Sequence, residues 1–196
     1  MSEHIALIWK KLDHLARMRE YLRYSIAQVT ALLPISDWRA LQADQHETLA
    51  AFRIRFSEYQ EHMGKTMKAV AVEEEKPSEP FTAVLLYMEK LGCIASVDRW
   101  KDIRELRNAV NHEYEDDPHV LHEFFEQMVH AAPELLTWHD QLIGFCQITY
   151  PRNRPSKSGL KPPTYNPSPV GRSFSSDQLT HNDRHPANSS RSGHRR

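Results

Sequence analysis

The sequence RELRNAVNHEY contains several side chains of the kinds that enzymes use for acid–base and phosphate chemistry. On a helical wheel, Arg107, Asn111 and Tyr114 share one face of a helix. Asn108 and His112, four residues apart, lie on the adjacent face. A histidine can accept or deliver a proton near neutral pH, and an arginine can stabilise charge that develops on a phosphate. We therefore expect this helix to face a polar cleft or a partner.

The reaction that best suits these groups is metal-independent cleavage of RNA. No serine or cysteine nucleophile and no cluster of metal ligands stands beside them in the sequence. RNA carries its own nucleophile, since its 2′-hydroxyl can attack the neighbouring phosphate. We expect His112 to act as general base or acid and Arg107 to stabilise the phosphorane. Asn108 and Asn111 would support the site, and Tyr114 would lie in the cleft.

Each of these residues also has an ordinary structural explanation. Arg107 could form a surface ion pair with Asp102, and His112 could occupy a helix end that the macrodipole favours. Tyr114 could be half-buried with its hydroxyl in water. An arginine followed five residues later by a histidine is expected about once by chance in a chain of this composition. The addition of Asn108 and Tyr114 makes the combination rare, and this favours the functional interpretation.

Apolar residues at three- and four-residue spacing predict amphipathic helices around this segment and no strand. Pro34 should end the first helix, and Ser36 should cap a short connecting element. Gly92 suits the end of the third helix, and Ser96 should cap the fourth. Pro133 should kink or divide the fifth. The helices are expected at about residues 5–32, 44–72, 81–91, 97–114 and 119–146. The expected buried face of the second is Leu49, Phe52, Phe56, Tyr59, Met63, Met67 and Val70.

These helices predict an all-α fold, an up-and-down bundle of four to six helices in residues 1–148. Residues 149–196 are rich in proline, serine and basic side chains, and we expect them to be a disordered tail. The charge also changes along the chain. Residues 1–150 hold 16 basic and 24 acidic residues, whereas residues 151–196 hold nine and two. The tail could attract nucleic acid weakly, or could serve only as a solubilising extension.

Composition limits the remaining classes of function. Cys93 and Cys146 stand far apart in the sequence, and the twelve histidines are scattered, so we expect reduced thiols, a cytoplasmic location, and no metal or other cofactor. No apolar run is long enough for a membrane span, and the first residues lack the pattern of a signal peptide.

The basic residues of the first helix could attract RNA or could form a solvated face. The four tryptophans are interpreted as packing residues, because no polar side chains cluster with them: Trp9, Trp38, Trp100 and Trp138.

The motif RNAVNHEY resembles the R-N-x-x-x-H-x-Y signature of HEPN-domain ribonucleases. It is similar in particular to the HepT-like toxins, which are found beside a minimal nucleotidyltransferase (MNT) antitoxin. The longer sequence ELRNAVNHEYEDDP also resembles relatives described as substrate-binding subunits of such nucleotidyltransferases. The resemblance covers about residues 5–147, and its specificity rests on roughly a dozen of them.

The resemblance implies roles for individual residues. Arg107 and His112 match the catalytic arginine and histidine, and Asn108 matches the polar residue that supports them. Tyr114 matches the tyrosine that the MNT partner modifies with AMP to silence the toxin. The family's site forms where two such helices meet across a homodimer axis, and the separation of Arg107 and His112 by about 140° on the wheel suits such a site. Glu113 departs from the glycine found in many members.

Three functions remain open at this point. The first is a metal-independent endoribonuclease toxin that acts on RNA as a homodimer and is neutralised by an MNT-type antitoxin. The second is a non-catalytic substrate-binding subunit of a nucleotidyltransferase, in which the same polar groups recognise a nucleotide. The third is a purely structural bundle that forms a dimer, with the motif incidental.

Overall fold

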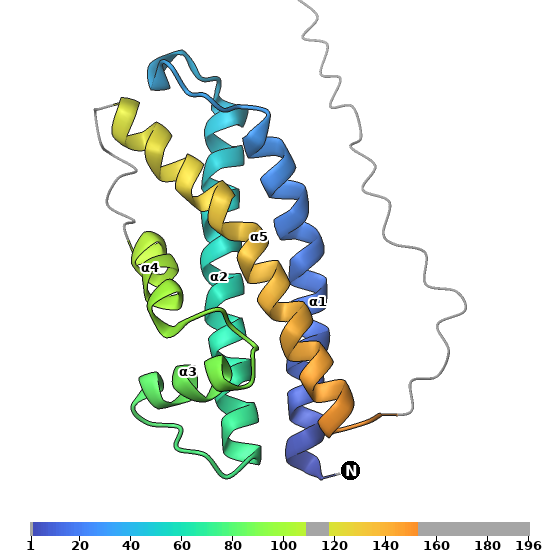
Figure 1. The fold of residues 1–196 in the computed structure, drawn as a ribbon. Helices are drawn as coiled ribbons and strands as arrows, with labels where there is room; N and C mark the ends of the chain where they lie inside the picture. The colour runs from blue at the N-terminus through green and yellow to red at the C-terminus, as the bar shows by residue number, and fades with distance from the viewer. Residues whose placement is uncertain (1, 109–117, 153–196) are drawn as a thin grey trace, which may run out of the picture. The chain divides into compact units, whose positions relative to one another are not determined.

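The structure is a computed structural model that describes residues 2–108 and 118–152. This part of the chain is all-α and contains no strand, as the sequence predicts. Figure 1 shows three long helices beside one another and two shorter ones against α2. The elements are α1 (Glu3–Thr30), the 3₁₀ helix η1 (Trp38–Ala40), α2 (Ala43–Glu73), α3 (Phe81–Lys90), α4 (Val97–Asn108) and α5 (Pro118–Thr149).

Helices α1 and α2 form an antiparallel hairpin that holds much of the core. The start of α1 meets the end of α2, where His4 Nδ1 lies 2.6 Å from a Glu73 carboxylate oxygen. Farther along, the rings of His14 and His62 are 4.8 Å apart. All seven residues of the buried face expected for the second helix are buried, so the three-and-four spacing located this face correctly.

Helix α5 crosses both members of the hairpin (Figure 1). Pro133, which the sequence analysis expects to kink or divide this helix, does not divide it, because α5 continues through it to Thr149. A proline inside a helix costs about 3 kcal/mol. Here burial of the flanking side chains can offset that cost, since each large apolar group contributes about 1.5–3 kcal/mol. The buried residues that flank Pro133 are Ala131, Ala132, Leu135 and Leu136.

Helices α3 and α4 are short and pack against α2 at Gly64. A Cβ atom at this glycine would lie 3.3 Å from the Phe81 ring of α3 and 3.5 Å from the Trp100 ring of α4. The absence of a side chain therefore lets both rings approach the α2 backbone. Between the two helices, Gly92 has φ +69°, a left-handed conformation that favours glycine, as its expected place after the third helix requires.

The connection between α1 and α2 corrects one expected cap. Asp37, rather than Ser36, caps η1, and its side chain accepts a hydrogen bond from the Arg39 backbone N–H. Both residues are of types that favour this position, so the sequence alone does not choose between them. The local backbone decides, because the helical turn begins at Trp38.

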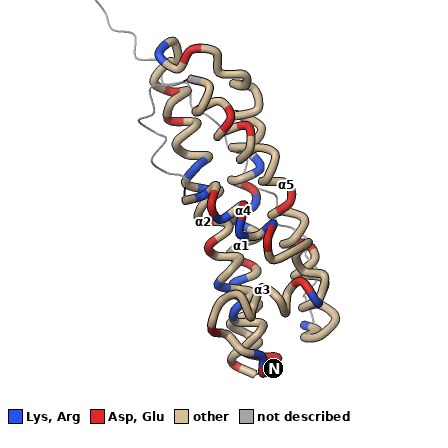
Figure 2. The backbone as a smooth tube through the Cα atoms, turned by 60° about the vertical axis from the view of Figure 1, so that its left-hand side comes forward, with Lys and Arg blue, Asp and Glu red and all other residues tan. Residues whose placement is uncertain are grey.

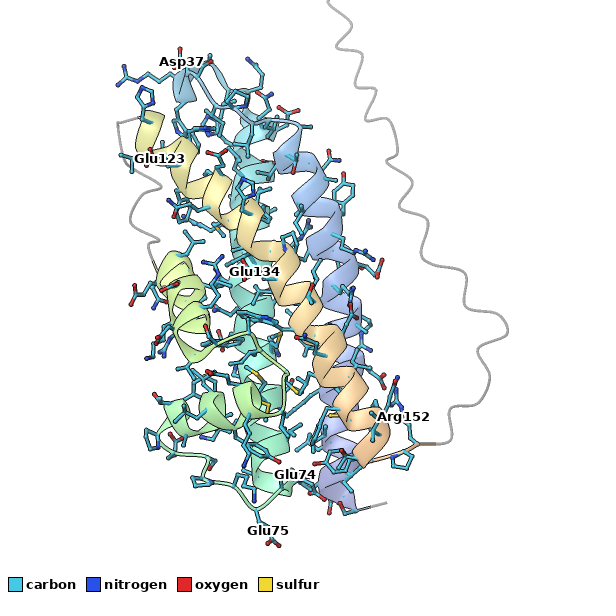
Figure 3. All side chains as sticks on the ribbon, viewed as in Figure 1. Asp37, Glu74, Glu75, Glu123, Glu134 and Arg152 are labelled. Atoms are coloured by element: carbon cyan, nitrogen blue, oxygen red, sulfur yellow. The ribbon has the colours of Figure 1, made fainter. Side chains whose placement is uncertain are left out.

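The end of α5 is fastened to the start of α1. Trp9 Nε1 donates a hydrogen bond of 3.1 Å to the Tyr150 carbonyl. The Arg152 guanidinium lies 4.2 Å from the Trp9 ring centroid and forms two hydrogen bonds, of 2.6 and 2.9 Å, with Asp13. We call Trp9, Asp13 and Arg152 the Arg152 clasp (Figure 3 labels Arg152). These contacts join α1 to residues that follow the end of α5.

Contacts within the chain divide it into two units after Asn153. The second unit contains most of the expected basic tail and lies outside the described residues. No helix among the described residues combines the length and apolar character that a membrane span requires.

Candidate functional site

The C-terminal turn of α4 presents the described half of the predicted motif. Ser96 begins the helix as predicted, since its hydroxyl accepts a hydrogen bond of 3.0 Å from the Arg99 N–H. Trp100 and Ile103 are buried and hold the helix in the core. Arg99 also pairs with Glu134 of α5, with Arg99 Nε 3.0 Å from one carboxylate oxygen and Nη2 2.5 Å from the other (Figure 3 labels Glu134). Helix α4 is therefore fixed from both sides.

Arg107 and Asn108 form a hydrogen-bonded pair at the end of this helix. Arg107 Nε and Nη2 donate to Asn108 Oδ1 at 3.2 and 3.1 Å. Arg107 is half-buried and Asn108 is exposed. Asp102, which could have paired with Arg107, instead has a carboxylate oxygen 4.0 Å from Arg99. The amide oxygen of Asn108 thus orients the guanidinium, and the role of Asn108 in a catalytic site stays a prediction.

The charge of Arg107 has an electrostatic effect on Glu61 of helix α2. The pKa of the exposed Glu61 carboxyl is lowered, chiefly by its hydrogen bond and ion pair with Lys65, and by a smaller contribution from Arg107. Lys65 Nζ lies 2.6 Å from Glu61 Oε1. The guanidinium is therefore in an environment that contains both signs of charge.

A hollow lies beside this turn, between α4 and the start of α5, with a volume of about 390 Å³. Three carboxylates line it, those of Asp102, Glu105 and Glu123, and we call it the acidic hollow. Its apolar floor includes Leu106 and Phe124. Figure 3 labels Glu123 near the beginning of α5. The carboxylates would repel a phosphate that approached through this hollow, although solvent and salt screen exposed charges.

The other predicted site residues, Asn111, His112 and Tyr114, lie outside the described residues. The structure therefore places Arg107 and Asn108 together and leaves the acid–base and modification roles as predictions. The homodimer cleft also remains a prediction.

Sequence reasoning missed a second hollow, which we call the aromatic pocket. It has a volume of about 130 Å³ and lies between η1, the first half of α2 and the start of α5. Trp38, His46 and Arg53 are among the residues that line it. Trp38 packs against the core, as the sequence analysis expects, but it also has a polar neighbour, His46, that the sequence analysis did not anticipate. His46 and Arg53, seven residues apart, share one face of α2, a signal present in the sequence. The facing rings of α5 could be located only from tertiary packing.

The basic residues of α1 do not form an uninterrupted positive surface. Figure 2 shows acidic and basic positions interspersed along the helices of the described chain. Arg19 pairs with Asp140 of α5 through two hydrogen bonds, one of which measures 2.9 Å. Part of the charge that could have attracted RNA is thus neutralised within the bundle. Trp9 likewise has a charged neighbour, Arg152, which the sequence analysis did not anticipate.

Comparison of the chain with protein families, with curated proteins and with solved structures finds no match in any of the three. Within the described residues, no group of three or more His, Cys, Asp or Glu side chains could hold a metal ion. The resemblance to HEPN-domain ribonucleases therefore rests on the sequence motif alone.

Proposed function

We propose that this protein is a metal-independent endoribonuclease of the HEPN type, a toxin that acts on RNA as a homodimer. The observation that carries the proposal is the Arg107–Asn108 pair on the last described turn of α4. A guanidinium oriented by a neighbouring amide and only half-buried can bind a phosphate with directed hydrogen bonds. The helix that holds it is anchored to α2 and α5, so the group is pre-organised.

In the proposed reaction, His112 removes the proton from a ribose 2′-hydroxyl. The 2′-oxygen forms a bond to the adjacent phosphorus while the bond from phosphorus to the 5′-oxygen breaks. The leaving 5′-oxygen takes a proton from an acid, a role open to His112 of the second copy. Arg107 stabilises the extra negative charge of the phosphorane. The products are a 2′,3′-cyclic phosphate and a 5′-hydroxyl end, and no metal ion is consumed or required.

Cleavage of single-stranded RNA by the purified full chain, in the presence of a chelator, tests this proposal. We expect Arg107→Ala and His112→Ala each to lower the cleavage rate about 100-fold or more, as loss of a charge-stabilising or acid–base group does. Arg104→Ala is the matched control, since Arg104 is exposed one turn earlier on α4. Cleavage that persists in both variants would refute the mechanism.

Neutralisation by an MNT-type nucleotidyltransferase is proposed to act through AMPylation of Tyr114. Co-expression with such a partner, followed by mass spectrometry of the peptide that contains Tyr114, measures this directly. We expect a mass increase of one AMP group that Tyr114→Phe abolishes. An unmodified tyrosine in an inactive complex would mean that the partner blocks the site sterically.

The acidic hollow favours a second candidate, the non-catalytic substrate-binding subunit. The three carboxylates of this hollow, on α4 and the start of α5, disfavour the close approach of an RNA backbone there and suit a basic surface of a protein partner. Under this candidate the purified chain cuts no RNA, even without a partner, and still forms a complex with the nucleotidyltransferase. The cleavage experiment therefore separates the two functions.

A further inference from the structure

Flat aromatic rings and two nitrogen-bearing side chains line the aromatic pocket. Trp38, Phe124 and Phe125 supply its aromatic walls, and His46 and Arg53 supply its polar ones. No carboxylate is among the described residues that line it, in contrast with the acidic hollow. The guanidinium and imidazole groups, beside flat aromatic side chains, suit an anionic ligand with a flat ring.

The rings are held in place by one another. Trp38 stacks on Phe125, with ring centroids 6.1 Å apart and planes inclined by 17°. His46 meets Trp38 edge to face at 4.8 Å, and Phe124 meets Phe125 edge to face at 5.2 Å. Rings that are already ordered lose little conformational freedom when a ligand binds, which favours recognition by stacking.

The polar groups lie on one face of α2. His46 and Arg53 are seven residues, or about two helical turns, apart. A guanidinium binds phosphate through paired N–H donors, and an imidazole can donate an N–H in either protonation state. A ligand that reaches both would carry its phosphate near α2 and its ring against the aromatic walls.

We propose that the aromatic pocket binds the base of a phosphorylated nucleotide, with the phosphate at Arg53 and His46. The volume of about 130 Å³ is close to that of an apolar cavity of roughly 150 Å³ that accommodates benzene, so it admits one flat ring system and little more. The proposal rests on the proposed function only for the source of the nucleotide, which would be an RNA strand. Phe124 lines both this pocket and the acidic hollow, so the two hollows adjoin each other.

Calorimetric titration of the full chain tests the proposal with three probes: 5′-AMP, ribose 5-phosphate and a 2′-O-methyl tetra-adenylate, which cannot undergo attack by a 2′-hydroxyl. We expect saturable binding of 5′-AMP, of the oligonucleotide, or of both, and binding of ribose 5-phosphate at least about tenfold weaker. Binding of 5′-AMP alone identifies a free nucleotide as the ligand, and binding of the oligonucleotide alone identifies an RNA strand.

Two variants and a control locate the site. Arg53→Gln should weaken binding about tenfold, and Ala50→Leu, which fills the pocket from α2, should abolish it. Arg39→Gln should leave binding unchanged, because Arg39 is exposed on η1 and does not line the pocket. Thermal unfolding monitored by circular dichroism verifies that each variant is folded.

The proposal is overturned if the wild type binds neither nucleotide probe, or if ribose 5-phosphate binds as tightly as 5′-AMP. It is also overturned if folded Ala50→Leu binds like the wild type. None of these results depends on RNA cleavage, so failure of this proposal and failure of the proposed nuclease function are distinguishable.

Discussion

Tyr59 of α2 and His139 of α5 form a hydrogen bond in the interior of the bundle. The Tyr59 hydroxyl lies 2.5 Å from His139 Nδ1, and both side chains are fully buried. His139 Nε2 has no hydrogen-bond partner among the described residues. Burial, with a further contribution from Arg19, lowers the pKa of His139 to about 4, and burial raises that of Tyr59. The pair is therefore neutral at physiological pH.

This pair predicts that the bundle loses stability in mild acid. The unfolded chain binds a proton at His139 below about pH 6.5, whereas the folded chain binds it only below about pH 4. The contribution of neutral His139 to the unfolding free energy is thus complete above about pH 6.5, and it is lost as the pH decreases to about 4. A pKa difference of this size corresponds to about 3 kcal/mol of unfolding free energy. Urea unfolding at pH 7 and pH 4.5 measures the loss.

Two charged groups also act on His139: Arg19 lowers its pKa and Asp140 raises it, and burial is the largest of the three causes. His139→Gln retains a hydrogen-bonding side chain but cannot titrate, so its stability should change much less between the two pH values. His130→Gln is the control, since the His130 side chain is 77% exposed. Equal pH dependence in the wild type and His139→Gln would contradict the prediction.

Two glycines inside long helices should respond differently to substitution. At Gly144 of α5 an added Cβ atom meets nothing within 4 Å, so Gly144→Ala should stabilise the protein by about 0.5–1 kcal/mol. At Gly64 the same atom would lie 3.3 Å from the Phe81 ring, so Gly64→Ala should gain less, and Gly64→Leu should destabilise the bundle by about 1–3 kcal/mol. Thermal unfolding measures all three. A stable Gly64→Leu variant would argue against the described packing of α3 and α4.

The Arg152 clasp should contribute modestly to stability. Its ion pair is partly exposed, with 22% of the Arg152 side chain and 45% of the Asp13 side chain accessible. We expect Arg152→Ala to cost about 1 kcal/mol, which includes the loss of its contact with the Trp9 ring. A double-mutant cycle with Asp13→Asn, followed by urea unfolding, separates the ion pair from the ring contact. If the changes in unfolding free energy of the two single variants add up to that of the double variant, the ion pair between Asp13 and Arg152 does not stabilise the protein.

Both cysteines should be unreactive in the folded protein. Cys93 and Cys146 are buried free thiols, and burial raises their pKa values to about 11 and about 12. Because the thiolate is the reactive form, a disulfide reagent at pH 8 should label neither in the native state and both in denaturant. Rapid labelling of the native chain would mean that the helices around these thiols open frequently.

The helical fold was predictable because its signal is local. The residues from Leu49 to Val70 repeat at helical spacing over the second helix, and burial follows that repeat. The effect of Pro133 was not predictable, since continuity of the helix depends on what its neighbours pack against. The aromatic pocket was missed for a similar reason: Trp38 and Phe125 are far apart in the sequence, and only the fold stacks them. For the predicted site, the motif singled out Arg107 and Asn108. The acidic hollow could not be predicted, because side chains of two different helices form it.

The Arg152 clasp also has a mechanical consequence. It joins the start of α1 to the residues that follow α5, so the two ends of the described bundle lie next to each other. A force that pulled these ends apart would load the contacts between α1 and α5 one after another, as in unzipping, rather than all at once in shear. The bundle should therefore yield at low force from its ends, and the clasp is the first contact that such a force would have to break.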